Sequence, residues 1–213
     1  MTNTTTSNTH TDSASSSSIP DARPNFQIAA RLCGEVLAGI RADQLDLATP
    51  CKDFTVGQLC GHVIAVANRI GVLGQGGDFF ATPQSIDVAF ADRPAAYSSS
   101  VEVALDAWAV DGALDQTITV PWGVLPGAAI VMMYVNELSV HTWDLATATG
   151  QQPVWNDDAL GMALFAMQFG LPRDGRSANG DGADGVAPFA TVVDVDDDAP
   201  LIDRLVAWNG RRP

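Results

Sequence analysis

The sequence predicts a mainly all-α protein, an antiparallel four-helix bundle with a small mixed C-terminal extension. In several long segments the apolar residues recur at the three- and four-residue spacing of one helix face. Glycine, proline and polar clusters separate these segments, as expected between helices. The chain has 213 residues and a hydrophobic content of 46%, which is enough for one large core.

Four long helices are expected in the first 150 residues. Thr55 is suited to cap the N-terminus of the second helix. Pro126 is expected in the first turn of the fourth helix, where proline is tolerated, and Gly150 is a natural end for it. The expected helices cover residues 26–40, 56 to about 74–77, 94–110 and 126–150.

The rest of the chain is expected to be less regular. Residues 1–23 are almost entirely Thr, Ser, Asn and Asp, which cannot bury enough apolar surface to offset chain entropy, so a disordered tail is expected. Residues 24–152 then form the bundle, and residues 153–213 form an extension packed on it. Smaller expected elements are an extended piece at 117–120, a turn at 121–123, a helix at 156–169, a loop at 173–185, an extended segment at 187–195 and a helix at 200–208.

Charge and cysteine content argue against several function classes. The chain has 25 acidic and 11 basic residues and a formal net charge of −14, so it repels phosphate backbones and anionic lipid. We therefore expect neither nucleic-acid nor membrane binding. The most apolar run, residues 124–135, is too short to cross a membrane. Three cysteines without a CxxC pair, and no secretory signal, favour the cytoplasm.

One candidate metal site combines glutamate and histidine, two residue types that are scarce in this chain. Glu137 and His141 are four residues apart in the fourth expected helix, so both side chains project from one otherwise apolar face. A buried carboxylate and imidazole are costly unless they are paired or bound to a metal. His62, on the buried side of the second helix, is the remaining histidine outside the tail. Two imidazoles and one carboxylate leave an open position, which is typical of catalytic zinc sites.

Simpler interpretations of these residues exist. A histidine on an apolar helix face is more often a hydrogen-bonded core residue, and a Glu/His pair at this spacing is often only a surface contact. Asp144, three residues after His141, either orients a ligand histidine or is a surface or capping acid. Arg69 either binds a substrate carboxylate or, as the commoner case, forms a surface salt bridge.

Other chemically active residues are expected to be structural. Trp122 and Trp143 are interpreted as core aromatics rather than as pocket walls. Cys51 and Cys60 are interpreted as buried structural thiols rather than as metal ligands. The acidic run at 194–198 lacks the spacing of a calcium loop and is interpreted as solvated.

Three motifs resemble one bacterial metal-binding family. ELSVHTWDLATATG at 137–150 resembles the family signature ELxVHxWDLAxATG, and TPCKDFTVGQLCGH at 49–62 resembles TPCxxWxVxxLxxH, with Phe54 in place of the usual tryptophan. VPWG at 120–123 and PGA at 126–128 resemble the loop before the last bundle helix. The chain is thus identified as a member of the DinB/YfiT-like superfamily, close to the N-terminal domain of mycothiol-dependent maleylpyruvate isomerases.

The resemblance implies a bundle in which His62, Glu137 and His141 bind a divalent metal, zinc or nickel. Better-understood relatives act on or with low-molecular-weight thiols: mycothiol, bacillithiol or glutathione. This implies a metal-dependent transferase or isomerase in which the metal holds the thiol as its thiolate and a small-molecule substrate occupies the bundle mouth. A non-catalytic metal or ligand carrier and a metal-assisted hydrolase remain as alternatives, and the protein is expected to be a monomer or a homodimer.

Overall fold

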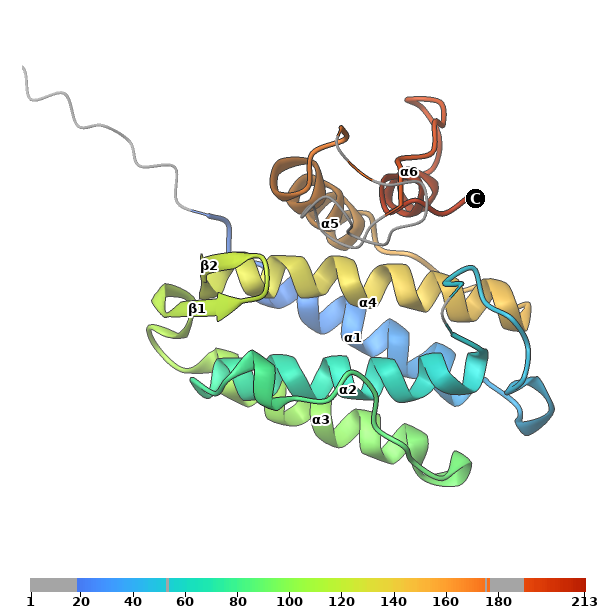
Figure 1. Ribbon diagram of the computed structural model, residues 1–213, viewed down its shortest axis with the longest axis horizontal. Helices are drawn as coiled ribbons and strands as arrows, with labels where there is room; N and C mark the ends of the chain where they lie inside the picture. Colours follow the sequence, from blue (N-terminus) through green and yellow to red (C-terminus); the bar gives the residue numbers. More distant parts are fainter. Residues whose placement is uncertain (1–18, 53, 175, 177–189) are drawn as a thin grey trace, which may run out of the picture.

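Four long helices form a bundle, and two shorter helices lie against it (Figure 1). The computed structural model describes residues 19–52, 54–174, 176 and 190–213. The mainly all-α fold class is confirmed, because the described part of the chain contains one two-stranded sheet and is otherwise helical or irregular. The bundle helices are α1 (Arg23–Ala38), α2 (Val56–Gly74), α3 (Arg93–Ala109) and α4 (Gly127–Thr149).

The bundle consists of two parallel helix pairs that run in opposite directions. The C-terminal end of α1 lies beside that of α4, where the Gln151 side chain donates to Val36 O at 3.0 Å. The C-terminal ends of α2 and α3 also meet, and Trp108 Nε1 donates to Ile70 O at 2.8 Å. The connection at 75–92 runs back along the bundle to permit this (Figure 1). Helices α2 and α4 are therefore antiparallel, so that the early turns of α2 lie opposite the middle of α4.

The predicted start of α2 and end of α4 are confirmed. Thr55 caps α2 by accepting from Gln58 N, and the Gln58 side chain accepts from Thr55 N at 2.9 Å. This reciprocal pair satisfies two N–H groups that have no partner inside the helix. Gly150 ends α4 with φ +71°, a left-handed conformation that favours glycine.

The start of α4 differs from the prediction, because Pro126 belongs to a strand. Strand β1 (Thr117–Val120) pairs antiparallel with β2 (Gly123–Pro126), and Gly127 N donates to Gln116 O at 2.8 Å. The chain stays extended through Pro126, which occupies the N-cap position immediately before the helix. The extended piece at 117–120 is confirmed, whereas its partner strand was not predicted.

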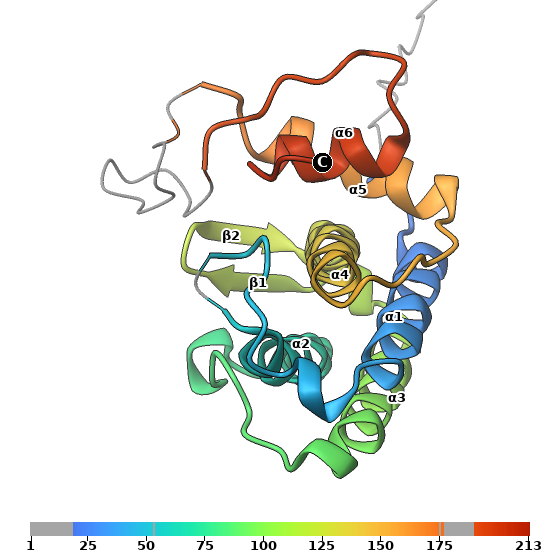
Figure 2. The ribbon, with the colours of Figure 1, turned by 90° about the vertical axis from the view of Figure 1, so that its right-hand side faces the viewer.

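Two further helices of the C-terminal extension cover one side of the bundle. Helix α5 (Asp157–Gly170) packs on α4 and α1, and α6 (Leu201–Trp208) packs on α5 and α4 (Figure 2). Residues 190–195, within the segment expected to be extended at 187–195, belong to no helix or strand; Val193 N donates to Ala207 O of α6 at 3.0 Å. Residues 187–189, the tail up to residue 18 and most of the loop at 173–185 lie outside the described residues.

Helix α2 corrects the expectation that no segment is long and apolar enough to cross a membrane. Its 19 residues reach a mean hydropathy of 1.3 and meet that criterion by length and composition. However, 78% of its most apolar window is buried inside the bundle, as is typical of the core helix of a globular domain.

Candidate functional site

The fold brings the three predicted metal ligands together between α2 and α4. His62 projects from the second turn of α2, and Glu137 and His141 project from adjacent turns of α4. Glu137 Oε1 lies 3.4 Å from His62 Nε2 and 3.5 Å from His141 Nε2. One donor atom of each residue lies within 4.8 Å of the other two. The arrangement fits a divalent metal, because two imidazole nitrogens and one carboxylate oxygen converge.

A backbone carbonyl fixes the ring orientation of His62. His62 Nδ1 lies 2.7 Å from Gln84 O, and because a carbonyl can only accept, Nδ1 carries a hydrogen and Nε2, on the side of Glu137, is the nitrogen that a metal would take. The Phe54 ring stacks on the imidazole at 4.9 Å between centroids with an interplanar angle of 25°. The loop is held at this place by Ile86 N, which donates to Gly61 O at 3.0 Å.

A buried carboxylate and an arginine support His141 in a similar way. Asp144 Oδ2 lies 3.0 Å from His141 Nδ1, and the Asp144 side chain is 0% exposed. Arg211, beyond the end of α6, donates to both carboxylate oxygens at 3.1 and 3.3 Å. The interpretation of Asp144 as a surface or capping acid is therefore wrong, because its carboxylate orients His141 inside the protein. Sequence reasoning missed Arg211, because it lies 67 residues from Asp144 along the chain and belongs to none of the three motifs.

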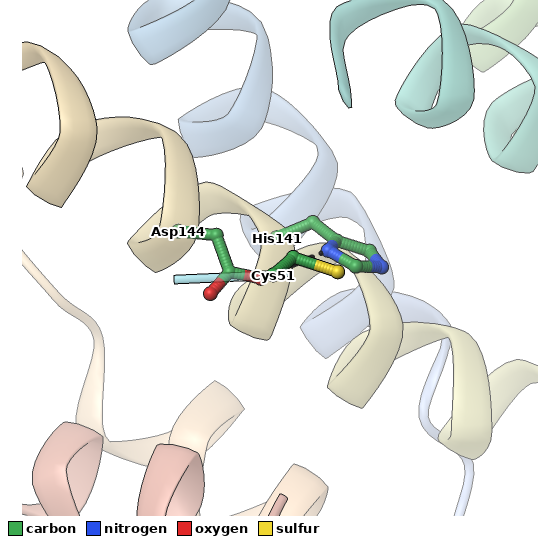
Figure 3. Close-up of side chains that lie close together, drawn as sticks. All are labelled: Cys51, His141 and Asp144. Carbon is green, nitrogen blue, oxygen red and sulfur yellow. Dashed lines mark hydrogen bonds and ion pairs between the residues drawn. The ribbon is translucent and has the colours of Figure 1, made fainter. Parts of the chain in front are cut away.

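Cys51 also lies beside His141, which differs from the prediction. Figure 3 shows Cys51, from the loop before α2, close to His141 and Asp144 of α4. Its sulfur lies within 4.8 Å of a His141 nitrogen and an Asp144 oxygen, and the residue is half-buried. Cys51 is therefore half-buried rather than fully buried, and its interpretation as a structural thiol rather than a metal ligand stays a prediction. Cys60 is buried, as predicted.

The hydrogen bonds set opposite charges on the ligand side chains of the metal-free protein. Burial alone would raise the pKa of Glu137, but its hydrogen bonds with His141 and His62 hold that pKa well below its usual range. Burial alone would lower the pKa of His141, but its hydrogen bonds to Asp144 and Glu137 raise that pKa from 6.5 to about 9. The pKa of Asp144 is lowered by His141 and Arg211 against the opposite effect of burial.

Arg69 is buried, so the expectation of a surface salt bridge is wrong. The residue is 5% exposed, and its guanidinium lies 4.8 Å from the centre of the Phe79 ring. Arg69 Nε donates to Thr82 Oγ1 at 2.8 Å, and Nη2 donates to Pro83 O at 2.7 Å. These bonds hold the segment that presents Gln84 O to His62. The predicted contact between Arg69 and a substrate carboxylate stays a prediction.

Two tryptophans and the acidic run at 194–198 were also interpreted from the sequence. Trp143 packs half-buried against the core, as predicted. Trp122 is 51% exposed and meets Phe79 edge to face at 5.7 Å, so it is not a core residue. The acidic residues at 194–198 are exposed, and Asp194 pairs with Arg173, which confirms a solvated segment.

Comparison with known proteins places the chain in a family. The family model for the mycothiol maleylpyruvate isomerase N-terminal domain matches residues 26–146, more than half of the chain. The chain belongs to this family. Two proteins similar to this chain are uncharacterized proteins of Mycobacterium tuberculosis, from strains CDC 1551 / Oshkosh and ATCC 25618 / H37Rv. Each is 31% identical over 182 residues, which cover 83% of this chain and 90% of the relative.

Solved structures support the family fold. A crystal structure of the mycothiol-dependent maleylpyruvate isomerase matches with a TM-score of 0.51, and one of a histidine-to-alanine mutant matches with 0.53. In both cases the identity is 13%, and the match covers 70% of this chain and 68% of the other. At this identity the likeness concerns the fold, and the chemistry has to be argued from the residues.

Proposed function

We propose that this protein is a metal-dependent enzyme that uses a low-molecular-weight thiol in a transferase or isomerase reaction on a small molecule. The observation that carries the proposal is the convergence of His62 Nε2 and His141 Nε2 on Glu137 Oε1, with each opposite ring nitrogen held by its own acceptor. Membership of the mycothiol maleylpyruvate isomerase N-terminal domain family supports mycothiol as the thiol.

The proposed roles follow from the position of each side chain. His62, Glu137 and His141 would hold the ion, zinc or nickel. A bound divalent ion stabilises the thiolate form of a thiol, and the thiolate is the nucleophile. Asp144 keeps the His141 ring in place and counterbalances charge at its Nδ1. Glu137 is the most exposed of the three ligands, with 32% of its side chain accessible against 9% and 8% for the histidines, so substrate would approach from its side.

Metal content is the first test of this proposal. The wild type, reconstituted with zinc or nickel, is expected to hold about one ion per chain, because three ligands suffice for a catalytic site. His62→Ala and His141→Ala are expected to lose it. Glu102→Gln, which changes an exposed glutamate of α3, is the control and should retain it. A metal-free wild type after reconstitution, or full metal content in both histidine variants, would contradict the site.

Thiol-dependent turnover is the second test. The metal-loaded protein would be incubated with mycothiol, bacillithiol or glutathione and a panel of electrophiles that includes maleylpyruvate. The proposal expects consumption or rearrangement of an electrophile only when the thiol is present, and none in His141→Ala. Turnover of esters or amides without a thiol would favour a hydrolase, and ligand binding without turnover would favour a carrier.

A further inference from the structure

A second group of metal-ligand side chains lies at the other edge of the His141 ring. Cys51, His141 and Asp144 each offer one ligand atom, and these three atoms lie within 4.8 Å of one another (Figure 3). Asp144 Oδ2 lies 3.0 Å from Nδ1 of the ring, whereas Nε2 lies on the side of Glu137. The second group therefore uses the Nδ1 edge of the imidazole, and the proposed thiol-activating metal uses the Nε2 edge.

The spacing of these ligand atoms is close to what one ion requires. Zinc–sulfur and zinc–nitrogen bonds measure about 2.3 and 2.0 Å, so the ligand atoms of a tetrahedral zinc ion lie roughly 3.3–3.7 Å apart. An approach of at most about 1.5 Å closes the group around an ion. Phe54 N donates to Cys51 O at 3.0 Å and holds the loop, so rotation of the Cys51 side chain is the simplest such movement.

Burial and charge favour a cation at this place. The Asp144 side chain is 0% exposed and Cys51 is half-buried, so an ion would enter from the Cys51 side. A Cys51 thiolate and the Asp144 carboxylate together carry two negative charges. Arg211, whose Nη2 lies 3.1 Å from Asp144 Oδ2, compensates one of them. The remaining negative charge is stabilised by a bound divalent cation.

The ligand set and Arg211 together select the kind of ion. Magnesium and calcium take several oxygen ligands, whereas this group has one carboxylate, which Arg211 already holds by two hydrogen bonds. Thiophilic ions gain a bond to the thiolate sulfur that hard cations do not gain. That bond offsets the repulsion from the Arg211 guanidinium.

We propose that Cys51, His141 Nδ1 and Asp144 form a second metal position, which binds a thiophilic divalent ion such as zinc or cadmium. The ion replaces the hydrogens on Cys51 Sγ and His141 Nδ1, which pass to solvent. It displaces the hydrogen bond between His141 and Asp144 and lies near Arg211, so it binds more weakly than an ion at His62, Glu137 and His141. This position therefore fills only above one ion per chain. Cys51 is then a ligand rather than a structural thiol.

Cobalt(II) is a suitable probe, because a cobalt–thiolate bond gives a charge-transfer absorption band that nitrogen and oxygen ligands do not give. Cobalt(II) would be titrated into the full-length protein loaded with one zinc per chain. We expect a band that saturates near one cobalt per chain, that is retained in Cys60→Ala and that is lost in Cys51→Ser. Cys60→Ala is the control, because it removes a buried thiol outside the group. The absence of a saturable band, or an unaltered band in Cys51→Ser, would overturn the proposal.

His62→Ala separates this proposal from the proposed function. The variant removes a ligand of the first site and none of the second, so the band should persist in it when cobalt is added alone. Loss of the band in His62→Ala would show that Cys51 belongs to a single shared site, which would refute a second position.

Competition between ions needs no variant, so the proposal stays testable even if Cys51→Ser folds poorly. Excess cadmium should remove the cobalt–thiolate band, because it binds thiolate strongly, whereas excess magnesium should leave the band unaltered. A band that magnesium removes, or that survives excess cadmium, would contradict a thiophilic position.

Discussion

At the scale of single residues, Asp144 has the clearest expected effect on metal binding. Its carboxylate is buried and touches both His141 Nδ1 and Arg211. We expect Asp144→Asn to lower zinc affinity by about 10–100-fold, because the supporting partner of a ligand histidine fixes its orientation and basicity. Titration against a competing chelator measures this. Asp106→Asn, an exposed acid of α3, is the control, and equal affinities in the two variants would show that Asp144 does not support the ligand.

The pKa of His141 predicts how the stability of the metal-free protein depends on pH. That pKa is about 9 in the folded protein against an ordinary value of 6.5, so the folded state binds the proton more tightly. This contribution is fully present below pH 6.5 and is lost as the pH rises through 9. We expect the free energy of unfolding to fall by an amount on the order of 3 kcal/mol across that range. Urea titrations at several pH values measure it, and His141→Ala should show a flatter profile.

Glu137 and Asp144 give the stability of the metal-free protein the opposite pH dependence at low pH, so that stability falls as the pH falls. The pKa values of Glu137 and Asp144 are lowered in the folded protein, so their contribution is present above their ordinary values of 4.5 and 3.8. It is lost as the pH falls through the folded pKa of each group. The metal-free protein should therefore be most stable between the range where these carboxylates protonate and the range where His141 loses its proton.

Residue patterns could predict the candidate ligands but not all of the side chains that hold them. Glu137 and His141 were singled out because two scarce residue types occur one turn apart, which is a local pattern. Arg211 reaches Asp144 from a position 67 residues further along the chain, and no local spacing indicates such a contact. Cys51 lies in a loop whose path depends on how the bundle closes, so its approach to His141 could not be predicted either.

At the scale of secondary structure, the capping box of α2 has a measurable contribution. Thr55→Ala removes the acceptor for Gln58 N and should lower the free energy of unfolding by about 1 kcal/mol. Urea unfolding of the metal-free protein measures this. Ser98→Ala, at an exposed position inside α3 without a capping role, should be neutral or slightly stabilising. A change of the same size in both variants would show that the cap itself contributes nothing.

Helix positions were predictable at this scale, whereas their directions were not. Long apolar faces and end signals such as Thr55 and Gly150 define a helix from within its own sequence. The parallel pairing of α2 with α3 depends on the irregular connection at 75–92, which has no periodicity that reveals its path. Strand β2 was missed because its four residues are too short for an alternation pattern and include Pro126.

At the scale of the whole molecule, the C-terminal extension contacts the helix that carries two of the three proposed ligands. The side chains of Asn136 in α4 and Asn209 after α6 form a buried reciprocal pair with distances of 2.8 and 3.2 Å. Two residues later, Arg211 reaches Asp144. The extension thus holds Asp144, and through it His141 of the proposed metal site, from the side of α4 that faces away from α2. The division at residues 152 and 153 stays a prediction, because these contacts join the two parts.

This connection predicts that the extension affects both stability and metal affinity through Arg211. Arg211→Ala removes one of the two cationic partners of the fully buried Asp144 carboxylate and leaves His141 alone, which should lower the free energy of unfolding by roughly 3 kcal/mol. Zinc affinity should fall as well, because Asp144 then loses the partner that fixes it against His141. Arg212→Ala, an exposed neighbour, is the matched control and should change neither quantity. A loss of stability with unaltered zinc affinity in Arg211→Ala would limit the extension to a packing role, whereas a loss of both would make it part of the metal site.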